Sequence, residues 1–481
     1  MNERRQRVRR SPEQRARAVS RRRFLGGLGA AAAFAIVPRH VLGGEGHVAP
    51  SDKTTLAGIG TGGQGSQNML RLQQFAEVQV VAVCDVNRES GGYLSWNWGR
   101  GEDLRLAGRE PVRRALDEYY AEQRGVGEYQ AIKTYADYRD LLSTEDVDAV
   151  MVAVPDHAHA MITLAAIRQG KHVYCEKPLT YSVREARMVT DAARKAKVAT
   201  QLGNQGQASE EARLTQEFIL DGALGPVREV HISRGPVFWD GPPGNRRPTD
   251  TPPVPDGLDW DLWLGPAPER PYHPAYHPWR WRDWRDFGTG PLGDMGCHLL
   301  STPFKALKLG HPISVEALAC HELGPEIHPR SFRVRYEFPA RGDMPPVTLV
   351  WHDDGYDPPR PKDLEEGRRV SGLIYVGDDG VLMGHRLVPE SKMQSYGRPP
   401  KVLPRSVGQD KEWVDACRGG EPAGSDFVNH SGILTETPLL GNIAIRFPNK
   451  KLLWDGPNLR FTNEEAANQY LHREYRDGWV L

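Results

Sequence analysis

The sequence predicts an α/β fold with two domains: a doubly wound parallel sheet over residues 52–205, then a second α/β domain over residues 206–481. Apolar, β-branched runs alternate with helical patterns in the first part, which is typical of a parallel sheet covered on both faces. The composition changes beyond residue 235, where a proline-rich loop precedes most of the tryptophans. The 481 residues also exceed the usual size of a single hydrophobic core.

The elements of the first domain follow one another in a regular order. TTLAGI (54–59) is expected to form a short buried strand, and SQNMLRLQQF (66–75) the helix after a glycine cluster. Further strands are predicted within VQVVAVCD (78–85), VDAVMVAVP (147–155), HVYCEKP (172–178) and VATQLGN (198–204), with helices within YADYRDLL (135–142), HAMITLAAIRQG (159–170) and VREARMVTDAARKAK (183–197). This alternation indicates a doubly wound sheet.

The second domain has a different pattern. SFRVRYEF (331–338), PPVTLVWHD (345–353) and GLIYVGDDG (372–380) contain alternating or clustered β-formers between turns. They predict a mostly antiparallel sheet.

The N-terminal segment carries a charge bias and an export pattern. Residues 1–44 contain eleven Arg and two Glu, a net charge of +9, so the rest of this neutral chain carries about −9 and gives no reason to expect a nucleic-acid partner. Arg21 and Arg22 precede the apolar run LGGLGAAAAFAIV (25–37), which is too short for a comfortable membrane span. Residues 1–44 are therefore predicted to be a twin-arginine export signal that sends the protein to the periplasm, with membrane association only if the signal is retained.

The glycine cluster matches the G-x-G-x-x-G pattern of a dinucleotide-binding turn. We assign Gly60 to the tight turn, Gly62 to close approach of a pyrophosphate and Gly65 to packing of the helix on the strand, with the helix beginning at Ser66. The next strand ends in Asp85, where an acid can accept hydrogen bonds from both ribose hydroxyls and repel a 2′-phosphate. NAD is therefore predicted over NADP, although the nearby Arg88 leaves room for a phosphate.

Three later motifs resemble those of a known family. VDAVMVAVPDHAHA, GKHVYCEKPLT and Gly293-Asp294-Met295-Gly296-Cys297-His298 occur in order, and the chain is similar to the glucose-fructose oxidoreductase and inositol dehydrogenase family (Gfo/Idh/MocA) over residues 54 to about 310. LDWDLWLGPAPERPYHP and FGTGPLGDMGCH resemble its secreted branch. The resemblance implies a dinucleotide domain followed by a C-terminal α/β domain with a large open sheet, and it assigns catalytic roles to Lys177, Asp294 and His298.

The residues themselves support these roles. Lys177 follows a strand at the edge where ligands bind in open α/β sheets, and a spacing of four puts Asp294 and His298 on one helix face. We predict that His298 accepts the hydroxyl proton, that Asp294 orients or relays, and that Lys177 stabilises developing alkoxide charge. The predicted cofactor-binding residues are Gly60, Gly62, Gly63, Gln64, Gly65, Asp85, Pro155, His159, Glu176, Lys177, Asn204 and Gln205.

An aromatic stretch, residues 272–282, precedes the Asp294 helix. Tyr276, Trp279, Arg280 and Trp281 are predicted substrate-binding residues, because sugar sites combine aromatic faces with polar donors; packing of the loop against the second domain is the equal alternative. His273, His277 and His298 are irregularly spaced, so no metal is expected. The five cysteines imply no disulfide framework.

Three functions remain open at this point. The first is an exported oxidoreductase that transfers a hydride between tightly bound NAD and a secondary hydroxyl of a sugar, polyol or glycoside. The second is a glycosidase that uses bound NAD transiently for oxidation and elimination, which would release an aglycone without net redox change. The third is a non-catalytic ligand sensor, which the joint presence of Lys177, Asp294 and His298 disfavours. The expected partner is a small carbohydrate, and we expect a homo-oligomer.

Overall fold

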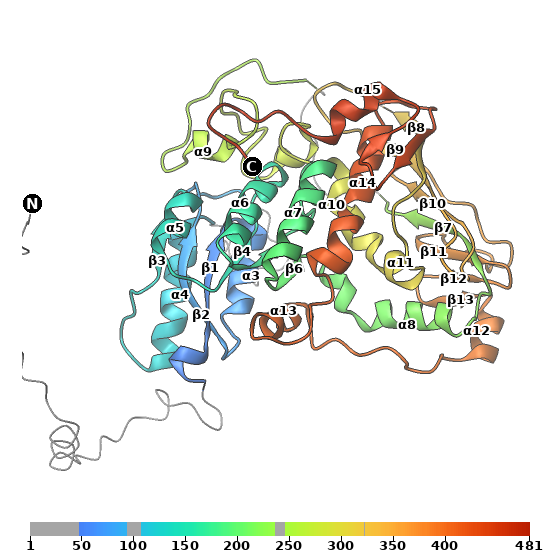
Figure 1. Ribbon diagram of the computed structural model, residues 1–481, viewed down its shortest axis with the longest axis horizontal. Helices are drawn as coiled ribbons and strands as arrows, with labels where there is room; N and C mark the ends of the chain where they lie inside the picture. The colour runs from blue at the N-terminus through green and yellow to red at the C-terminus, as the bar shows by residue number, and fades with distance from the viewer. Residues whose placement is uncertain (1–47, 94–106, 236–245, 322) are drawn as a thin grey trace, which may run out of the picture. The chain divides into compact units, whose positions relative to one another are not determined.

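The computed structural model describes residues 48–93, 107–235, 246–321 and 323–481. The predicted twin-arginine signal lies outside the described residues. Contacts group Lys53–Leu481 into one compact unit, and among the described residues before it Pro50–Asp52 forms a 3-10 turn. The description below concerns Lys53–Leu481 (Figure 1).

The first sheet has six parallel strands in the order β3-β2-β1-β4-β5-β6, the doubly wound arrangement of dinucleotide-binding domains. Its strands are β1 (Thr54–Ile59), β2 (Val78–Cys84), β3 (Lys133–Tyr135), β4 (Ala149–Val152), β5 (His172–Cys175) and β6 (Thr200–Leu202). The predicted fold class is confirmed. β3 is the one strand of this sheet that the sequence pattern did not predict, because its three residues are exposed or half-buried and form no apolar run.

The register of these strands aligns their carboxyl ends. Ile59 of β1 lies opposite Cys84 of β2 and Val152 of β4, and Val152 in turn lies opposite Cys175 of β5. Residues that directly follow these four strands therefore gather at one edge of the sheet. Five helices accompany the sheet: α3 (Gly63–Leu72), α4 (Arg109–Arg124), α5 (Tyr138–Thr144), α6 (Asp156–Arg168) and α7 (Val183–Ala196).

Both faces of this sheet are buried. Along β1, Leu56 belongs to one hydrophobic cluster and Ala57 to another, on opposite faces of the pleated strand. This explains the continuous apolar runs of the sequence.

The predicted start of the first helix was wrong. α3 begins at Gly63 rather than Ser66, because Gly60, with a φ of 86°, already reverses the chain after β1. The Ser66 N–H consequently donates to the Gly62 carbonyl at 2.8 Å as part of the helix.

The second sheet has nine strands in the order β13-β12-β11-β7-β10-β9-β8-β14-β15, and among these pairs only β7 and β10 run parallel. It is thus mostly antiparallel, as predicted. Its strands are β7 (Val227–Ser233), β8 (Ser314–His321), β9 (Ser331–Phe338), β10 (Val347–His352), β11 (Gly372–Gly377), β12 (Val381–Met383), β13 (Arg386–Val388), β14 (Leu452–Asp455) and β15 (Arg460–Phe461).

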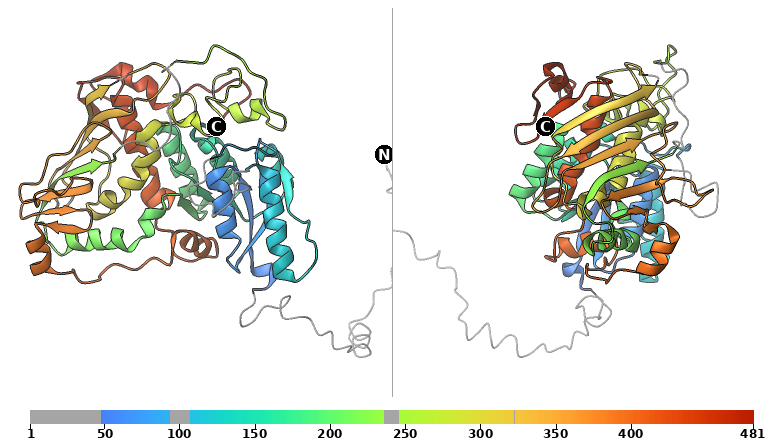
Figure 2. Two further views of the ribbon diagram at one scale, coloured as in Figure 1. Left: turned by 180° about the vertical axis from the view of Figure 1, so that it is seen from behind. Right: turned by 90° about the vertical axis from the view of Figure 1, so that its right-hand side faces the viewer.

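Helices pack on one face of this sheet. In the right-hand view of Figure 2, the strands lie in front of these helices. Along β9 every second side chain is buried, from Phe332 to Phe338, against the same core cluster that reaches Ile59 of the first sheet. The helices of this region are α8 (Glu210–Leu220), α10 (Gly290–Leu299), α11 (Ser301–Ala306), α12 (Glu390–Tyr396), α13 (Gln409–Cys417), α14 (Gly432–Ala444) and α15 (Glu465–Asn468). No helix in the described ranges is long and apolar enough to cross a bilayer.

A third hydrophobic cluster is formed by residues 258–287, which we call the aromatic segment, together with Ile327. It contains the short helix α9 (Trp260–Leu264) and a 3-10 turn, η6 (Arg280–Asp283). Its buried rings pack on one another and against Val86, which follows β2 directly after Asp85. The aromatic segment therefore covers the edge at which the carboxyl ends of the parallel strands meet.

Candidate functional site

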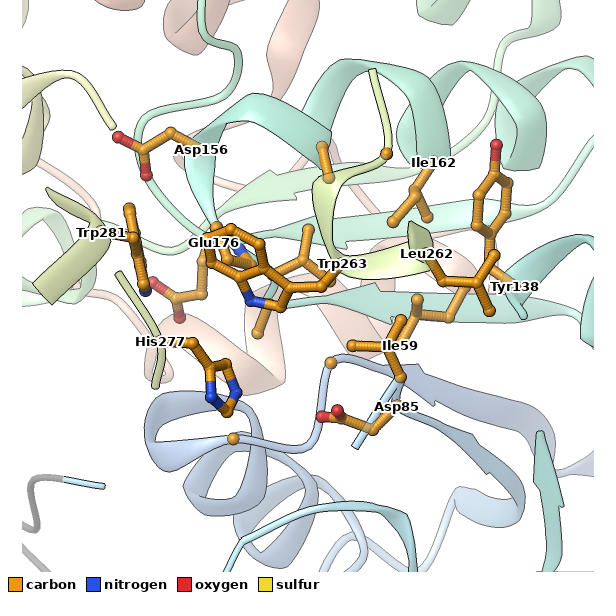
Figure 3. A pocket seen from close by; sticks show the side chains of 18 of the residues that line it. Ile59, Asp85, Tyr138, Asp156, Ile162, Glu176, Leu262, Trp263, His277 and Trp281 are labelled. Atoms are coloured by element: carbon orange, nitrogen blue, oxygen red, sulfur yellow. The ribbon is translucent and has the colours of Figure 1, made fainter. Parts of the chain in front are cut away.

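A cleft lies between this sheet edge and the aromatic segment, enclosing about 1280 Å³ including open solvent at its mouth. Figure 3 shows side chains of the sheet edge (Ile59, Asp85, Glu176) together with those of the aromatic segment (Trp263, His277, Trp281). The carboxyl edge of an open α/β sheet is where such folds bind ligands. Residues from other parts of the chain also line the cleft, among them Asp294 of α10, Tyr93 and, near the end of the chain, Trp479.

The glycine turn forms part of the cleft lining. A Cβ at Gly65 would lie 1.9 Å from the Gly60 carbonyl oxygen, so helix and turn approach more closely there than any other residue allows. Gly62, Gly63 and Gln64 line the cleft, and no described side chain caps α3 at Gly62. Their first-turn N–H groups are therefore available to an anionic group, as a pyrophosphate would require.

The contact at Gly62 differs from the role assigned to this glycine, which was close approach of a pyrophosphate. A Cβ at Gly62 would lie 2.7 Å from the Tyr93 ring, so in the structure it is this ring that approaches Gly62. The Tyr93 hydroxyl lies 3.4 Å from Nε2 of His277, and both residues line the cleft. Neither was predicted, because each depends on contacts between distant segments.

Asp85 lies next to the glycine turn with its carboxylate in the cleft lining. The Thr61 N–H donates to Oδ2 at 2.7 Å and the Asn87 N–H to Oδ1 at 2.8 Å. Burial raises the pKa of Asp85, and these two N–H donors act in the opposite direction. The Thr61 hydroxyl also donates to Oδ2, at 3.3 Å, so these three donors use three of the carboxylate's roughly four lone-pair sites and leave about one for a ribose hydroxyl. The residues present thus fit a dinucleotide.

Lys177 and Asp294 form an ion pair in the cleft lining. Nζ of Lys177 lies 2.7 Å from Oδ1 of Asp294, and both residues line the cleft. Burial by itself raises the pKa of Asp294, but the charges of Lys177 and Arg282 outweigh burial and lower it to about 2. Asp294 is therefore a carboxylate at neutral pH. The structure brings together two residues that the sequence assigned to one site.

Arg282 is a site residue that the sequence interpretation missed. Its Nε lies 3.5 Å from Oδ1 of Asp294, and its guanidinium lies 3.7 Å and 4.2 Å from the ring centroids of Trp279 and Trp281. Burial lowers the pKa of Arg282, which the charge of Asp294 partly offsets. The signal was present in the Arg-Trp-Arg run, where Arg280 was chosen instead.

The four predicted substrate-binding residues fall into two groups. Trp279 and Trp281 line the cleft, whereas Arg280 is half-buried outside the lining. Tyr276 is buried among rings, with centroid distances of 4.9 Å to Trp284 and 5.3 Å to Phe287. The packing alternative therefore describes Tyr276, and the binding alternative fits the two tryptophans.

Asp156 is a second residue that the sequence interpretation missed. It follows Pro155 at the start of α6 and lines the cleft. The backbone N–H and the hydroxyl of Thr289 donate to its Oδ2 at 2.9 Å and 2.6 Å. Burial raises the pKa of Asp156 to about 6, against the opposing effects of Thr289 and Arg282. An acid directly after a strand end was the available signal.

His298 lies one helical turn beyond Asp294 on α10 and outside the cleft lining. Burial, reinforced by the charge of Lys177, lowers the pKa of His298 to about 3, so the imidazole is neutral at physiological pH. It can accept a proton but does not carry one beforehand.

Of the remaining predicted cofactor-binding residues, some line the cleft and others contact the lining from behind. Pro155 and Glu176 line the cleft, and Glu176 accepts hydrogen bonds from Asn68 Nδ2 at 2.8 Å and Gln205 Nε2 at 3.3 Å. His159 contacts the Pro178 carbonyl through Nδ1 at 2.6 Å, and Asn204 Nδ2 donates to the Cys297 carbonyl at 3.2 Å. His159, Asn204 and Gln205 lie behind the lining. His159 contacts the segment after Lys177, Asn204 contacts helix α10, and Gln205 contacts Glu176. Within the described ranges, no group of three or more His, Cys, Asp or Glu has a metal-binding arrangement.

Two family models match the chain. Residues 101–204 match the NAD-binding Rossmann-fold domain of the Gfo/Idh/MocA oxidoreductase family, and residues 211–322 match the C-terminal α/β domain of the same family.

Curated relatives match over shorter stretches. An inositol 2-dehydrogenase of Salmonella paratyphi B is 32% identical over 181 residues, which is 37% of this chain and 45% of the relative. A 1,5-anhydro-D-fructose reductase of Ensifer adhaerens is 37% identical over 106 residues, 22% of this chain and 30% of the relative. The matched stretches span less than half the length of these relatives.

Solved structures share the fold over most of the chain. The WlbA dehydrogenase from Bordetella pertussis, in complex with NADH and UDP-GlcNAcA, aligns with a TM-score of 0.52 at 15% identity, covering 84% of this chain and 99% of that one. GenD2 from gentamicin A biosynthesis, in complex with NAD, aligns with a TM-score of 0.52 at 18% identity, covering 84% and 97%. At these identities the likeness is one of fold.

Proposed function

We propose that the chain is a Gfo/Idh/MocA oxidoreductase and that it transfers a hydride between bound NAD and a secondary hydroxyl group of a sugar, polyol or glycoside; the family matches over residues 101–204 and 211–322 and the inositol 2-dehydrogenase relatives support this. The observation that carries the proposal is the Lys177–Asp294 ion pair, with 2.7 Å between Nζ and Oδ1, in the cleft that the glycine turn also lines. Dehydrogenase chemistry needs a cofactor site and a group that handles a hydroxyl proton side by side, and this cleft has residues for both.

The proposed cofactor is NAD. The N–H groups at Gly62, Gly63 and Gln64 would hold the pyrophosphate and Asp85 a ribose hydroxyl. Arg88, the residue that favours a 2′-phosphate, is not part of the cleft lining, which supports NAD over NADP. When bound, the nicotinamide supplies the hydride acceptor.

The chain's own residues would handle the alcohol. The Lys177 ammonium would donate to the substrate oxygen and stabilise it as charge develops, while Asp294 fixes the position of Lys177. His298, which follows Asp294 by four residues on α10, would receive the proton. Trp279 and Trp281, which line the cleft beside Arg282, offer apolar faces to the C–H groups of a sugar ring.

The substrate class rests on the relatives and on the cleft. The curated relatives are named as dehydrogenases of inositol and levoglucosan and as a reductase of 1,5-anhydro-D-fructose. All three compounds are polyols or sugar derivatives. The aromatic faces and charged donors of the cleft suit the same chemistry. We further propose that the protein acts in the periplasm with the cofactor tightly bound, because a dinucleotide that dissociated there would be lost.

The test is a spectrum of the purified full-length protein. Addition of a panel of sugars, polyols and glycosides should produce absorbance at 340 nm from bound cofactor, and denaturation should release NAD(H) with little NADP(H) by mass spectrometry. His298→Ala should slow single-turnover reduction by about 10²- to 10⁴-fold, whereas His385→Ala, an exposed histidine, should react as the parent does.

Each part of the proposal has its own contrary result. Release of mainly NADP(H) would overturn the role of Asp85. His298→Ala reacting at the parental rate would overturn the proton route. Release of an aglycone without net redox change would identify glycosidase chemistry instead.

A further inference from the structure

A second cavity lies away from the cofactor cleft, where the start of α7, the start of α10 and the end of α14 come together (Figure 1). It encloses about 650 Å³ including open solvent, and its lining contains three arginines and two histidines: Arg285, Arg446, Arg473, His328 and His472. No aspartate or glutamate is present in this lining, within the described part of the chain. The cavity is therefore strongly basic.

Arg285 is the central observation. It is 4% exposed, and both terminal guanidinium nitrogens, Nη1 and Nη2, lack a hydrogen-bond partner among the described residues. Its Nε donates to the Gly324 carbonyl at 3.3 Å, which fixes the side chain from behind. A buried cation normally has a partner, because removing it from water is expensive. The two nitrogens of Arg285 form a fork of the kind that binds carboxylate or phosphate.

The other two arginines are placed by contacts that leave positive charge at the cavity. The Arg446 guanidinium lies 4.3 Å from the Tyr470 ring centroid, and that of Arg473 lies 4.5 Å from the Tyr181 ring centroid. Arg473 donates to two backbone carbonyls and is also attracted to Glu185. Glu185 itself accepts from the N–H groups of Tyr181 and Ser182 and from the Tyr475 hydroxyl. Arg285 and Arg446 therefore remain as cations without a carboxylate in hydrogen-bond contact among the described residues.

His328 adds an acceptor to the same cavity. Its Nε2 contacts the Gly288 carbonyl at 3.1 Å, so this nitrogen carries the hydrogen of the neutral ring and Nδ1 is left as an acceptor. Nδ1 is buried without a partner in the described structure. A ligand that supplies negative oxygens to Arg285 and one hydroxyl to His328 would satisfy both.

We propose that this second cavity binds a small oxyanion that carries a hydroxyl group, either hydrogen phosphate or a hydroxy-carboxylate. The geometry also connects the cavity to the cofactor cleft. Thr289 lines the cavity, its carbonyl accepts from Asn442 Nδ2 at 2.6 Å, and its N–H and hydroxyl donate to Asp156 in the cleft. A bound anion would thus lie against the residue that positions Asp156.

The test is titration of the full-length protein with inorganic phosphate and, separately, with glycolate. Excess NAD is present throughout so that the glycine turn is occupied, and chloride keeps the ionic strength constant. We expect saturable heat in calorimetry and a saturable rise in Tm with at least one of the two anions. Arg285→Gln and Arg446→Gln should each weaken binding about 10- to 100-fold, and Arg369→Gln, an exposed arginine, should not change it.

The two titrations distinguish a phosphate ligand from a carboxylate ligand, and they also show when the proposal is wrong. Binding of phosphate alone identifies a phosphate site, and binding of glycolate alone a carboxylate site. Absence of saturable binding by both anions, or unchanged binding in both Arg285→Gln and Arg446→Gln, would overturn the proposal. Because Arg446 is only half-buried, its variant gives a result even if Arg285→Gln does not fold. None of these outcomes depends on whether the protein oxidises a sugar.

Discussion

Lys177, Arg282 and Asp294 form a charge cluster in which two cations share one carboxylate. Lys177 lies 2.7 Å and Arg282 3.5 Å from the same oxygen, Oδ1 of Asp294. Removing Asp294 would leave both cations facing each other in a largely buried setting, which proteins tolerate poorly. Asp294 therefore has a structural role in addition to the orienting role predicted from sequence.

Asp156 supports a prediction about stability and pH. Its pKa is about 6 in the folded protein against an ordinary value of 3.8, because burial outweighs the hydrogen bonds from Thr289. The folded state thus binds this proton more tightly than the unfolded chain does. The resulting stabilisation is complete below about pH 4 and is lost as pH rises through about 6, on the order of 3 kcal/mol.

The side chain introduced by Asp156→Asn cannot ionise, so this variant should not lose stability in this way as pH rises. Its free energy of unfolding, measured by urea denaturation, should therefore rise relative to the parent by on the order of 3 kcal/mol between about pH 4 and pH 7. Asp378→Asn, an exposed acid, serves as the control. A difference between Asp156→Asn and the parent that stays constant over this range would show that Asp156 keeps an ordinary pKa.

At the scale of single residues, the sequence located the parts of the site that have local signals. Lys177 follows a strand and Asp294 belongs to a recognisable motif, and the two meet as expected. Arg282 and Asp156 were missed because their importance comes from distant partners, Asp294 for the first and Thr289 for the second. Such pairings have no spacing in the sequence from which they could be inferred.

At the scale of elements, the turn between β1 and α3 is the most constrained feature of the cleft. Gly65→Ala would place a Cβ 1.9 Å from the rigid Gly60 carbonyl oxygen, and relief requires a shift of the helix or the turn. We expect a loss of about 1–3 kcal/mol in the free energy of unfolding and weaker NAD binding, because the N–H groups at Gly62 and Gly63 move with the helix.

Chemical denaturation and calorimetric titration with NAD measure both effects. Gly310→Ala is a matched control, because a Cβ there meets no atom within 4 Å and φ is not positive. It should change stability by no more than about 0.5 kcal/mol. Parental stability and NAD affinity in Gly65→Ala would contradict the assigned packing role.

The elements themselves were predicted well where the pattern was long or strongly apolar. β1 and β9 have the predicted bounds, Thr54–Ile59 and Ser331–Phe338. The start of α3 was misplaced because glycines that line a ligand-binding turn also begin the helix. Helical geometry there is imposed by close packing on the strand, which local propensity does not report.

At the scale of the whole molecule, the cleft combines segments from nearly the full length of Lys53–Leu481. Gly60 and Trp479 both line it although more than four hundred residues separate them. The aromatic segment has the same property, since its rings cover the edge of the first sheet while its backbone lies between β7 and β8 of the second sheet in sequence. The family resemblance supplied the order of the motifs, and only the fold placed Trp479, Tyr93 and His277 beside them.

The charge distribution of the whole chain leads to the last prediction, which concerns location. Residues 1–44 carry a net charge of +9 on a chain that is neutral overall, and only Arg23 and Phe24 separate Arg21-Arg22 from the apolar run. Replacing both with Lys keeps the charge and removes the guanidinium pair, so the substitution tests the pair itself. The variant should accumulate in the cytoplasm, folded and with NAD bound, and be absent from the periplasmic fraction by immunoblot. Replacing Arg9 and Arg10 in the same way, a pair without an apolar run beside it, should leave export intact. If the Arg21-Arg22 variant reaches the periplasm as the parent does, export by the twin-arginine route is wrong, and with it the reason for expecting a cofactor that never leaves the protein.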